Sequence, residues 1–434
     1  MKKSKIVLTI MMILMLVVTS AGCQMFGSKK PVEPVTIYFS YPPYGYDTDK
    51  EMAFWNTQIA AFQAANPNIK VEFSVESWDN VYTKWEQALE TGATPDIGYD
   101  CPITAVDYAL QGKVLPVTDL VNKLGGDAAF NEGMLDYKAG GEWYGVPHGD
   151  ASMVLLYRKD LLKAAGYDNP PKNWDELVEI AKATTKNGVY GFGFFTGDDY
   201  QSSQILTGLM AAAGGVMIDK DGKVALNSPE NLKALELVDL LYNKLKVVPE
   251  STLTWEHSDP ANAIGTGKVA MAVTWGGYGT LLPSMFPDQI QNIGFAKLPD
   301  GPSGHSGSWS GTGGFFIFKN AKHPEEAKQF IEYMSKPELS KEWALISGNV
   351  SPFVSITNDP ELTKLEWYKA MQDQSPTQIT LGWGHDIILG AYMCDPIFTE
   401  AMVNVTINKK PPQEALKILQ ENVEKTIQEA NAKK

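Results

Sequence analysis

The chain has 434 residues, of which 44% are hydrophobic and 11% aromatic, and its formal net charge is −14 at pH 7. This length and composition exclude a disordered or fibrous protein and allow two or more packed domains. The acidic balance argues against a nucleic-acid-binding protein, which needs a basic surface to neutralise phosphates.

Residues 1–22 have the pattern of a secretory signal peptide. Three lysines precede an apolar run over residues 6–18, and small residues then lead into Cys23. The run is shorter than the roughly 20 apolar residues that a membrane span needs. The stretch "SAGC" resembles a bacterial lipobox, so we expect acylation of Cys23, with residues 23–34 as a polar tether. Cleavage by ordinary signal peptidase beside an unmodified cysteine is the alternative.

From residue 35 the pattern alternates between strand and helix. We predict strands at residues 35–41, 69–75 and 95–100, and helices between them at residues 49–67 and 77–92. This order predicts a parallel sheet with helical crossovers, whose ligands bind beyond the carboxyl ends of the strands. Those ends are the turn-rich, aromatic stretches "SYPPYGY" and "YDCP".

Two later helices have clear start signals. Asn173 is the expected N-cap of a helix within residues 169–188, with a glutamate three positions later as in a capping box. Ser228 is the expected N-cap of a helix within residues 227–245, followed by a proline in the first turn. The stretch "IDKDGKV" at residues 218–224 predicts a hairpin with an Asp-Gly turn.

Arg158 is the only arginine, which bears on the charge of the ligand. Because guanidinium groups are the favoured receptors for carboxylates and phosphates, a chain with one arginine is suited to a neutral ligand. Genomic base composition that lowers arginine everywhere explains the same observation. Besides Cys23 there are Cys101 and Cys394, which either form a disulfide or are small buried side chains.

Four segments resemble the carbohydrate-binding proteins of ABC transporters, in that family's order. They are "WYGVPHGDASMVLLYRKDLLKAAGYDNPPKNWDELVEIAKATT", "GKVAMAVTWGGY", "GTGGFFIFKNAKHPEEAKQFIEYMSKPE" and "PPQEALKILQENVEK". The resemblance implies an α/β, two-lobe periplasmic-binding-protein-like fold, with a hinge between the lobes and mixed sheets flanked by helices. It implies an N-terminal lobe of residues 35–148 and 297–348, and a C-terminal lobe of residues 149–296 and 349–434.

The same resemblance implies a sugar site in a cleft between the lobes. Aromatic rings suit the apolar faces of a sugar, and acidic, imidazole and indole groups suit its hydroxyls. We expect the ligand-binding residues to be Tyr41, Tyr44, Asp100, His148, Asp150, Asp198, Asp199, Tyr200, Trp275, Gly276, Trp309 and Trp383. Arg158 stands where the family usually has Asn, and many relatives have a Trp after the first strand, so the sugar is expected to differ from theirs.

The polar candidates have structural alternatives. Asp100 is placed where the resemblance has a cleft carboxylate, and it would also serve as a helix N-cap. His148 and Asp150 lie at the first crossing between the lobes, where hinge packing is the other explanation. Residues 198–200 match a ligand-contacting loop, and a solvated loop is the alternative.

The aromatic candidates also have alternatives. Trp275 ends a predicted strand and is followed by glycines that let a ligand approach the backbone, but it would also suit core packing. Trp309 and Trp383 are flanked by glycines in turns, which favours the site over the core. Tyr41 and Tyr44 either form a platform at the rim or order the turn between them.

The expected function is that of a membrane-anchored substrate-binding protein that carries a neutral mono- or oligosaccharide to an ABC permease, with no catalysis and no cofactor or metal. We expect a monomer on the outer face of the cell membrane, with the sugar, the permease and the membrane as partners and no nucleic acid. A secreted glycosidase that uses paired aspartates is one alternative. A surface adhesin lipoprotein, which would enclose no ligand, is the other.

Overall fold

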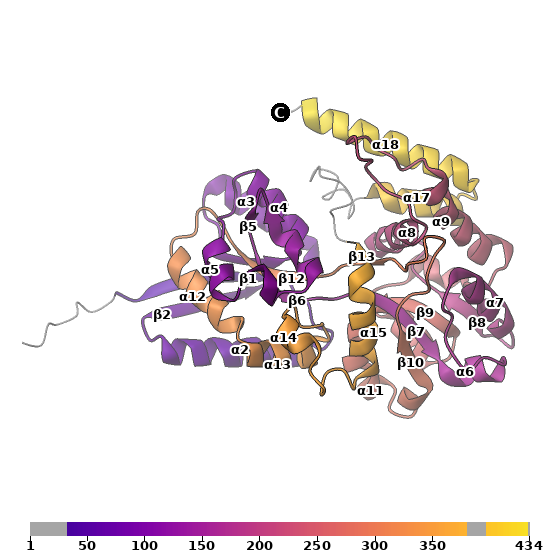
Figure 1. Cartoon of the computed structure of the whole chain (residues 1–434), viewed down its shortest axis with the longest axis horizontal. Coiled ribbons are helices and arrows are strands. Elements are labelled where there is room, and N and C mark those ends of the chain that lie inside the picture. The colour runs from indigo at the N-terminus through magenta and orange to yellow at the C-terminus, as the bar shows by residue number, and fades with distance from the viewer. Residues whose placement is uncertain (1–32, 380–395, 433–434) are drawn as a thin grey trace, which may run out of the picture.

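The computed structural model describes residues 33–379 and 396–432, and it has two α/β lobes side by side (Figure 1). Each lobe has its own mixed sheet and its own hydrophobic core. The predicted fold class is therefore confirmed. Among the described helices, none has both the length and the apolar composition needed to span a bilayer.

The first lobe is built around a five-stranded sheet. Its strands follow the order β2 (Ile69–Val75), β1 (Val35–Tyr41), β3 (Ile97–Asp100), β12 (Gly313–Ile317) and β6 (Val146–Gly149). β1 pairs in parallel with β2 and β3, as the alternation of strands and helices predicts. β12 is antiparallel to both of its neighbours, so a strand from a distant part of the chain makes the sheet mixed.

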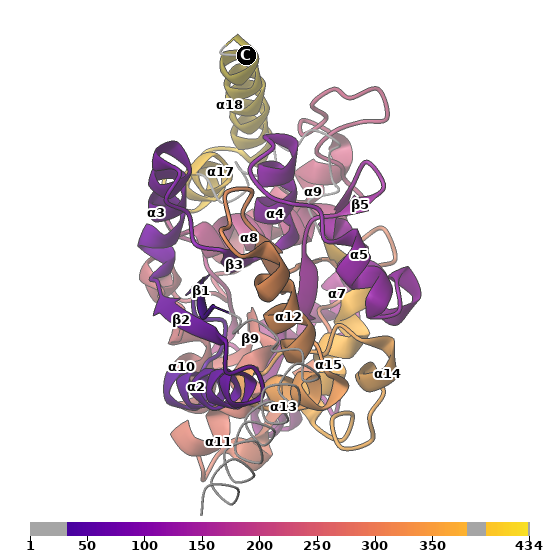
Figure 2. The same cartoon turned by 90° about the vertical axis from the view of Figure 1, so that its left-hand side faces the viewer.

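Helices cover both faces of this sheet. Phe315 of β12 packs on Trp55 of α2 (Thr48–Ala65), and the next residue, Phe316, packs on Trp85 of α3 (Trp78–Thr91). Because successive side chains of a strand point to opposite faces, α2 and α3 lie on opposite sides of the sheet, as Figure 2 shows. The other helices of this lobe are α4 (Pro102–Leu110), α5 (Thr118–Lys123), α12 (Pro324–Met334), α13 (Pro337–Ser347) and α14 (Val354–Thr357).

The second lobe is built around a four-stranded sheet, in the order β10 (Ile293–Ala296), β7 (Met153–Arg158), β9 (Val269–Trp275) and β8 (Tyr190–Gly193). Every residue of β9 is buried, so this strand is the centre of the second core. Its helices are α6 (Lys159–Ala164), α7 (Trp174–Thr184), α8 (Tyr200–Ala212), α9 (Pro229–Asp239), α10 (Asp259–Gly265), α11 (Leu282–Met285), α15 (Glu366–Gln374), α17 (Pro396–Thr406) and α18 (Pro412–Ala432).

The predicted helix starts are confirmed. The side-chain oxygen of Asn173 accepts a hydrogen bond from the Glu176 backbone N–H at 2.9 Å, at the start of α7. The hydroxyl of Ser228 accepts the Asn231 backbone N–H at 3.2 Å, at the start of α9. The two ends of residues 218–224 pair in an antiparallel bridge, as a hairpin requires.

Three segments connect the lobes and are bonded to one another. The first runs from β6 to β7, the second includes β11 (Ser308–Trp309) and leads into β12, and the third follows α13. Asp150 and Val350 exchange both backbone hydrogen bonds, at 2.9 and 2.7 Å. Ser152 and Ser310 form an antiparallel bridge. The three segments therefore make one connected region between the two cores.

Some residues beside these segments pack differently from the expected lobe boundaries, and Trp309 and Phe353 are two of them. Trp309 belongs to the core of the second lobe, although it falls in residues 297–348. Phe353 belongs to the core of the first lobe, although it follows residue 348. Strand pairing explains both cases, since β11 pairs with β13 (Gln378–Ile379) and Phe353 forms a bridge with Phe130.

Candidate functional site

Asp100 is the last residue of β3, at the carboxyl edge of the first sheet. Its buried carboxylate accepts the Cys101 backbone N–H at 2.8 Å, the Thr104 hydroxyl at 2.7 Å and the Tyr44 hydroxyl at 3.0 Å. Burial raises the pKa of Asp100, and these hydrogen bonds oppose the rise. Asp100 thus binds residues at the start of α4 and orients Tyr44, but the N-cap residue of α4 is Cys101, so the expected N-cap role of Asp100 is not what the structure has.

An exposed aromatic surface adjoins Tyr44. The ring centroids of Tyr44 and Trp78 are 5.1 Å apart, and Trp78 and Tyr82 are 38% and 41% exposed. The Trp78 indole N–H donates to the Pro43 carbonyl at 2.9 Å, which fixes the orientation of the ring. Neither α3 residue was among the expected ligand-binding residues, although their spacing of four positions on a predicted helix places them on one face.

Tyr41 lies in the core of the first lobe and not at a rim. Its ring centroid is 4.9 Å from those of both Trp55 and Tyr99. Its hydroxyl donates to the buried carboxylate of Glu51. Strand alternation explains this position, because Tyr41 lies on the same face of β1 as the buried residue Phe39.

His148 is also part of the first core. It is 0% exposed, its ring stacks on Trp343 with a centroid distance of 5.2 Å, and a hydrogen bond of 3.2 Å joins its Nδ1 to the Tyr99 hydroxyl. Burial lowers the pKa of His148 to about 3. The imidazole is therefore neutral and packed among aromatic rings, which agrees with the packing alternative.

Asp150 ties the segments between the lobes together. Its buried carboxylate accepts the Thr312 hydroxyl at 3.1 Å and the Ser375 hydroxyl at 2.9 Å. Thr312 belongs to the second crossing, and Ser375 follows α15 of the second lobe. Burial raises the pKa of Asp150, and these neutral donors lower it. The side chain thus has the structural role that the hinge alternative describes.

Asp198 and Asp199, which precede α8, have different roles in the structure. The Asp199 carboxylate accepts the Gln201 backbone N–H at 2.7 Å and is the N-cap of α8. Burial raises the pKa of Asp199. Asp198 is exposed, and Tyr200 is 46% exposed. Of these three candidates, Asp198 and Tyr200 are exposed, whereas Asp199 is partly buried.

Trp275 and Gly276 lie where β9 ends. The Trp275 indole N–H donates to the Gln201 side-chain oxygen at 3.3 Å, and the residue is 7% exposed. The Gly276 backbone N–H donates to the Ser152 carbonyl at 3.0 Å. A methyl group on Gly276 would lie 2.3 Å from Met371, so glycine is required for the backbone to pack here.

The second crossing brings aromatic residues of the two lobes to one place. A methyl group on Gly311 would lie 2.7 Å from the Trp275 ring, and one on Gly313 would lie 2.9 Å from the Tyr44 ring. Trp275 of the second lobe and Tyr44 of the first therefore flank the same short stretch of chain. The two glycines have no side chain to occupy the space that these rings take.

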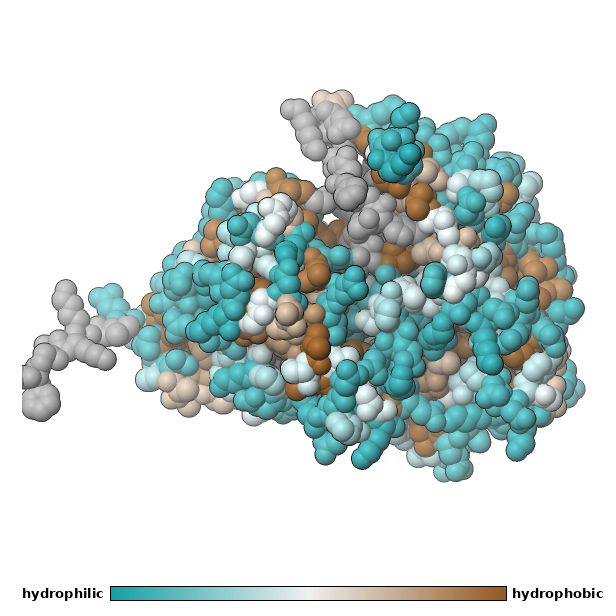
Figure 3. All heavy atoms as spheres, in the orientation of Figure 1, coloured by the Kyte–Doolittle hydropathy of each residue, from teal (hydrophilic) through white to brown (hydrophobic). Residues whose placement is uncertain are grey.

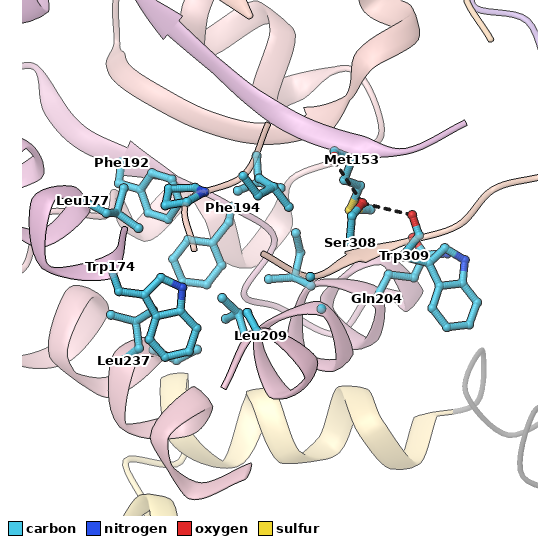
Figure 4. Close-up of a pocket in the computed structure, with 18 of the residues that line it drawn as sticks. Met153, Trp174, Leu177, Phe192, Phe194, Gln204, Leu209, Leu237, Ser308 and Trp309 are labelled. Atoms are coloured by element: carbon cyan, nitrogen blue, oxygen red, sulfur yellow. Dashed lines mark hydrogen bonds between the residues drawn. The ribbon is translucent and has the colours of Figure 1, made fainter. Parts of the chain in front are cut away.

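Trp309 lies elsewhere in the second lobe, against a cavity of about 40 Å³ between α8 and the sheet (Figure 4). Mostly apolar side chains such as Phe192 and Phe194 line this cavity, with Gln204 among the few polar ones. A cavity of this volume holds a few water molecules but no sugar ring. It is therefore a gap in the core and not the candidate site.

Three other expectations involve residues that the structure does not describe. Trp383, the lipidation candidate Cys23 and the possible disulfide partner Cys394 all lie outside residues 33–379 and 396–432.

Arg158 is used for structure. Its guanidinium donates to both carboxylate oxygens of Asp160, at 2.8 and 2.7 Å, and to the Ile264 carbonyl at 3.2 Å. The residue is buried beside β9. The one arginine is thus bonded within the second lobe and does not contact Asp100. The three donors described around Asp100 are all neutral groups.

A hinged ligand-binding protein has two lobes, connecting segments between them and polar and aromatic residues near those segments. This chain has two α/β lobes, three crossings bonded to one another, and the Asp100 carboxylate with aromatic rings near the second crossing. Residues 46–341 match the model of the bacterial extracellular solute-binding protein family, and the chain belongs to this family. The resemblance predicted from the sequence is confirmed. Since the family is extracellular, the chain functions outside the cytoplasm.

Relatives and solved structures agree with this assignment. A binding protein of Brucella abortus is 27% identical over 367 residues, which cover 82% of this chain and 85% of the relative. An ABC transporter-binding protein of Deinococcus radiodurans is 26% identical over 296 residues, 65% of this chain and 68% of the relative. The structure of maltose-bound T. maritima MalE3 matches with a TM-score of 0.79 and 22% identity, covering 90% of this chain and 99% of that chain.

Proposed function

We propose that the chain binds a neutral mono- or oligosaccharide between its lobes and delivers it to an ABC permease by hinge closure. The observation that carries this proposal is the position of Tyr44 and Trp275, one from each lobe, beside neighbouring glycines of the second crossing, with Asp100 bonded to Tyr44. The maltose in the T. maritima structure supports a sugar as the class of ligand.

The chemistry of these residues suits a sugar. Aromatic rings pack on apolar C–H faces, a contact worth about 0.5–1.5 kcal/mol beyond area burial if it resembles pairing between aromatic side chains. Each hydrogen bond to a hydroxyl adds about 0.5–1.5 kcal/mol net, and more when the acceptor is charged. A micromolar complex needs about 8 kcal/mol. Two or three rings with several hydroxyl contacts supply this after the ordering costs of binding.

Closure follows from the division of the site between the lobes. A ligand that contacts residues of both lobes does so only when the lobes are together, so its binding shifts the population towards the closed form. The permease then recognises the closed form. The sugar leaves unchanged, and no step needs a cofactor or a metal.

The proposal also includes attachment to the outer face of the cell membrane. Acyl chains on Cys23 hold the protein there, with residues 23–34 as the tether, because two chains give stable anchoring. The protein acts as a monomer in this proposal. In support, the hydrophobic residues on the face drawn in Figure 3 are scattered among hydrophilic ones and are not joined in one patch.

Calorimetric titration with a panel of mono- and oligosaccharides tests the proposal. We expect micromolar or tighter binding of at least one sugar, which is recovered intact. Asp100→Asn should weaken that binding by about 1.5–3 kcal/mol, because the Tyr44 hydroxyl loses the charged acceptor that orients its ring. Asp221→Asn, at an exposed turn of the second lobe, is the control and should bind like the wild type. Hydrolysis of the sugar would favour the glycosidase, and no heat with any sugar would contradict the proposal.

A further inference from the structure

The loop between β1 and α2 contacts two different parts of the molecule. We call residues 42–47 the interlobe loop. Its Tyr44 hydroxyl donates to Asp100 in the first lobe. Two positions later, the side chain of Tyr46 packs against the core of the second lobe. The loop therefore belongs to one lobe by its backbone and contacts the other with an aromatic ring.

Glu51 of α2 fixes the interlobe loop within the first lobe. One oxygen of its buried carboxylate accepts the backbone N–H of Tyr44 at 2.9 Å and that of Gly45 at 2.8 Å. The Tyr41 hydroxyl donates to the same oxygen. Hydrogen bonds to a carboxylate are stronger than those between neutral groups. The backbone just before Tyr46 is therefore held by the first lobe.

The second lobe provides a preformed contact surface for Tyr46. The Tyr46 ring centroid is 4.7 Å from that of Tyr278 and 5.8 Å from that of His257. The Tyr278 hydroxyl donates to the His257 carbonyl at 2.8 Å and lies 2.6 Å from its Nδ1. These bonds lie within the second lobe, so they position both rings independently of Tyr46.

Gly277 leaves the space that the Tyr46 ring occupies. A methyl group on Gly277 would lie 2.0 Å from Cε2 of Tyr46, much closer than van der Waals contact allows. Any side chain at position 277 would therefore displace the ring. The contact thus combines a glycine and two oriented aromatic rings on one lobe with one tyrosine on the other.

We propose that the contact of Tyr46 with Gly277, Tyr278 and His257 holds the two lobes together in the ligand-free protein and sets how far they open. None of these four residues lies on a crossing segment, although Gly277 packs against Gly348 at the start of the third crossing. The Tyr46 ring therefore adds a contact between the lobes beside the hinge. The interlobe loop also carries Tyr44 to Asp100, so one loop connects the candidate site to the degree of closure. The inference goes beyond sugar delivery and concerns the protein without any ligand.

Small-angle X-ray scattering of the ligand-free protein tests the contact from the first lobe. Tyr46→Ala should increase the radius of gyration, with the ratio of closed to open molecules reduced about two- to twelvefold, because an aromatic contact is lost. Tyr46→Phe keeps the ring and should stay as compact as the wild type. Tyr38→Ala removes an exposed tyrosine of the same lobe and is the matched control, with no expected change.

The same measurement on Gly277→Ala tests the contact from the second lobe. The added methyl group should displace the Tyr46 ring and expand the protein to a similar extent. Gly133→Ala is the control, because a methyl group there meets nothing within 4 Å. In the double variant the two effects should not add, since the Tyr46→Ala change has already removed the ring that the methyl group displaces.

Three outcomes would overturn the inference. They are scattering of Tyr46→Ala that superimposes on the wild type, expansion of Tyr46→Phe, and additive expansion in the double variant. These results are independent of the proposed function. If the protein binds no sugar in calorimetry but Tyr46→Ala expands it, the interlobe contact stands and the sugar proposal fails. If it binds a sugar but Tyr46→Ala leaves its dimensions unchanged, the sugar proposal stands and the interlobe contact fails.

Discussion

His148 is a titratable side chain in an aromatic surrounding. Its ring centroid is 5.2 Å from that of Trp343 and 4.8 Å from that of Phe315, and its Nε2 has no hydrogen-bond partner among the described residues. A proton on Nε2 would place an unpaired charge in this core, which is why burial lowers the pKa of His148 to about 3. In the unfolded chain its pKa is about 6.5.

We expect His148 to destabilise the protein as the pH falls from about 6.5 to about 3. In this interval the unfolded chain binds a proton that the folded protein does not bind. The free energy of unfolding therefore decreases by about 1.4 kcal/mol per pH unit on account of this group. Urea unfolding of the wild type and of His148→Gln at several pH values measures the effect. Parallel stability curves for the two proteins would contradict a neutral, buried imidazole.

Trp275 allows a direct test of stacking at the candidate site. Trp275→Ala should weaken sugar binding by more than about 1 kcal/mol, through the loss of a ring beside the second crossing. Trp174→Ala is the matched control, because Trp174 lines the apolar cavity of the same lobe. Both changes lower stability, but calorimetry should show a loss of affinity for Trp275→Ala alone. Equal losses would mean that Trp275 acts only through the fold of its lobe.

At the start of α8, two neighbouring aspartates have different roles. Asp199 caps the helix, whereas Asp198 is exposed. Asp199→Ala should lower the free energy of unfolding of the ligand-free protein by about 0.5–2 kcal/mol, because the first turn of α8 loses its acceptor. Asp198→Ala, one residue earlier and exposed, should change it by less than about 0.5 kcal/mol. Urea unfolding checks both values. If the two variants were equally stable, Asp199 would not act as the cap.

Short-range patterns explain which elements the sequence predicted well. β1 and β2 have the predicted bounds, and α7 begins after the predicted Asn173 cap. Strand alternation and capping depend on neighbours within about four residues, so they are visible in the sequence. The place of β12 between β3 and β6 was not predicted, because pairing between distant strands leaves no mark on the local pattern.

The candidate site was predicted less completely. The resemblance indicated Asp100 and Trp275, which lie near the second crossing, but the local pattern gave no means of separating buried from exposed aromatic residues. Tyr41 is in the core, whereas Trp78 and Tyr82, which were not named, are exposed near Tyr44. Exposure depends on which face of β1 or α3 meets the rest of the lobe, and this is decided by tertiary packing.

For the molecule as a whole, ligand binding and the interlobe contact should both affect the separation of the lobes. Addition of a binding sugar should decrease the radius of gyration of the wild type in X-ray scattering. The decrease should be larger for Tyr46→Ala, because that protein begins from a more open state. Tyr46→Phe should match the wild type. Dimensions that do not change with bound sugar in either variant would contradict hinge closure.

The order of strands in the first sheet has a consequence for secretion. If the chain crosses the membrane with its N-terminus first, β1, β2, β3 and β6 emerge early, and β12, which lies between β3 and β6, is the last strand of this sheet to emerge. All four strands of the second sheet lie between residues 153 and 296, so they have already emerged by then. Until Ile317 has crossed the membrane, β3 and β6 would lack the strand that joins them, so we expect an intermediate halted there to be cut by added protease more readily than the complete chain.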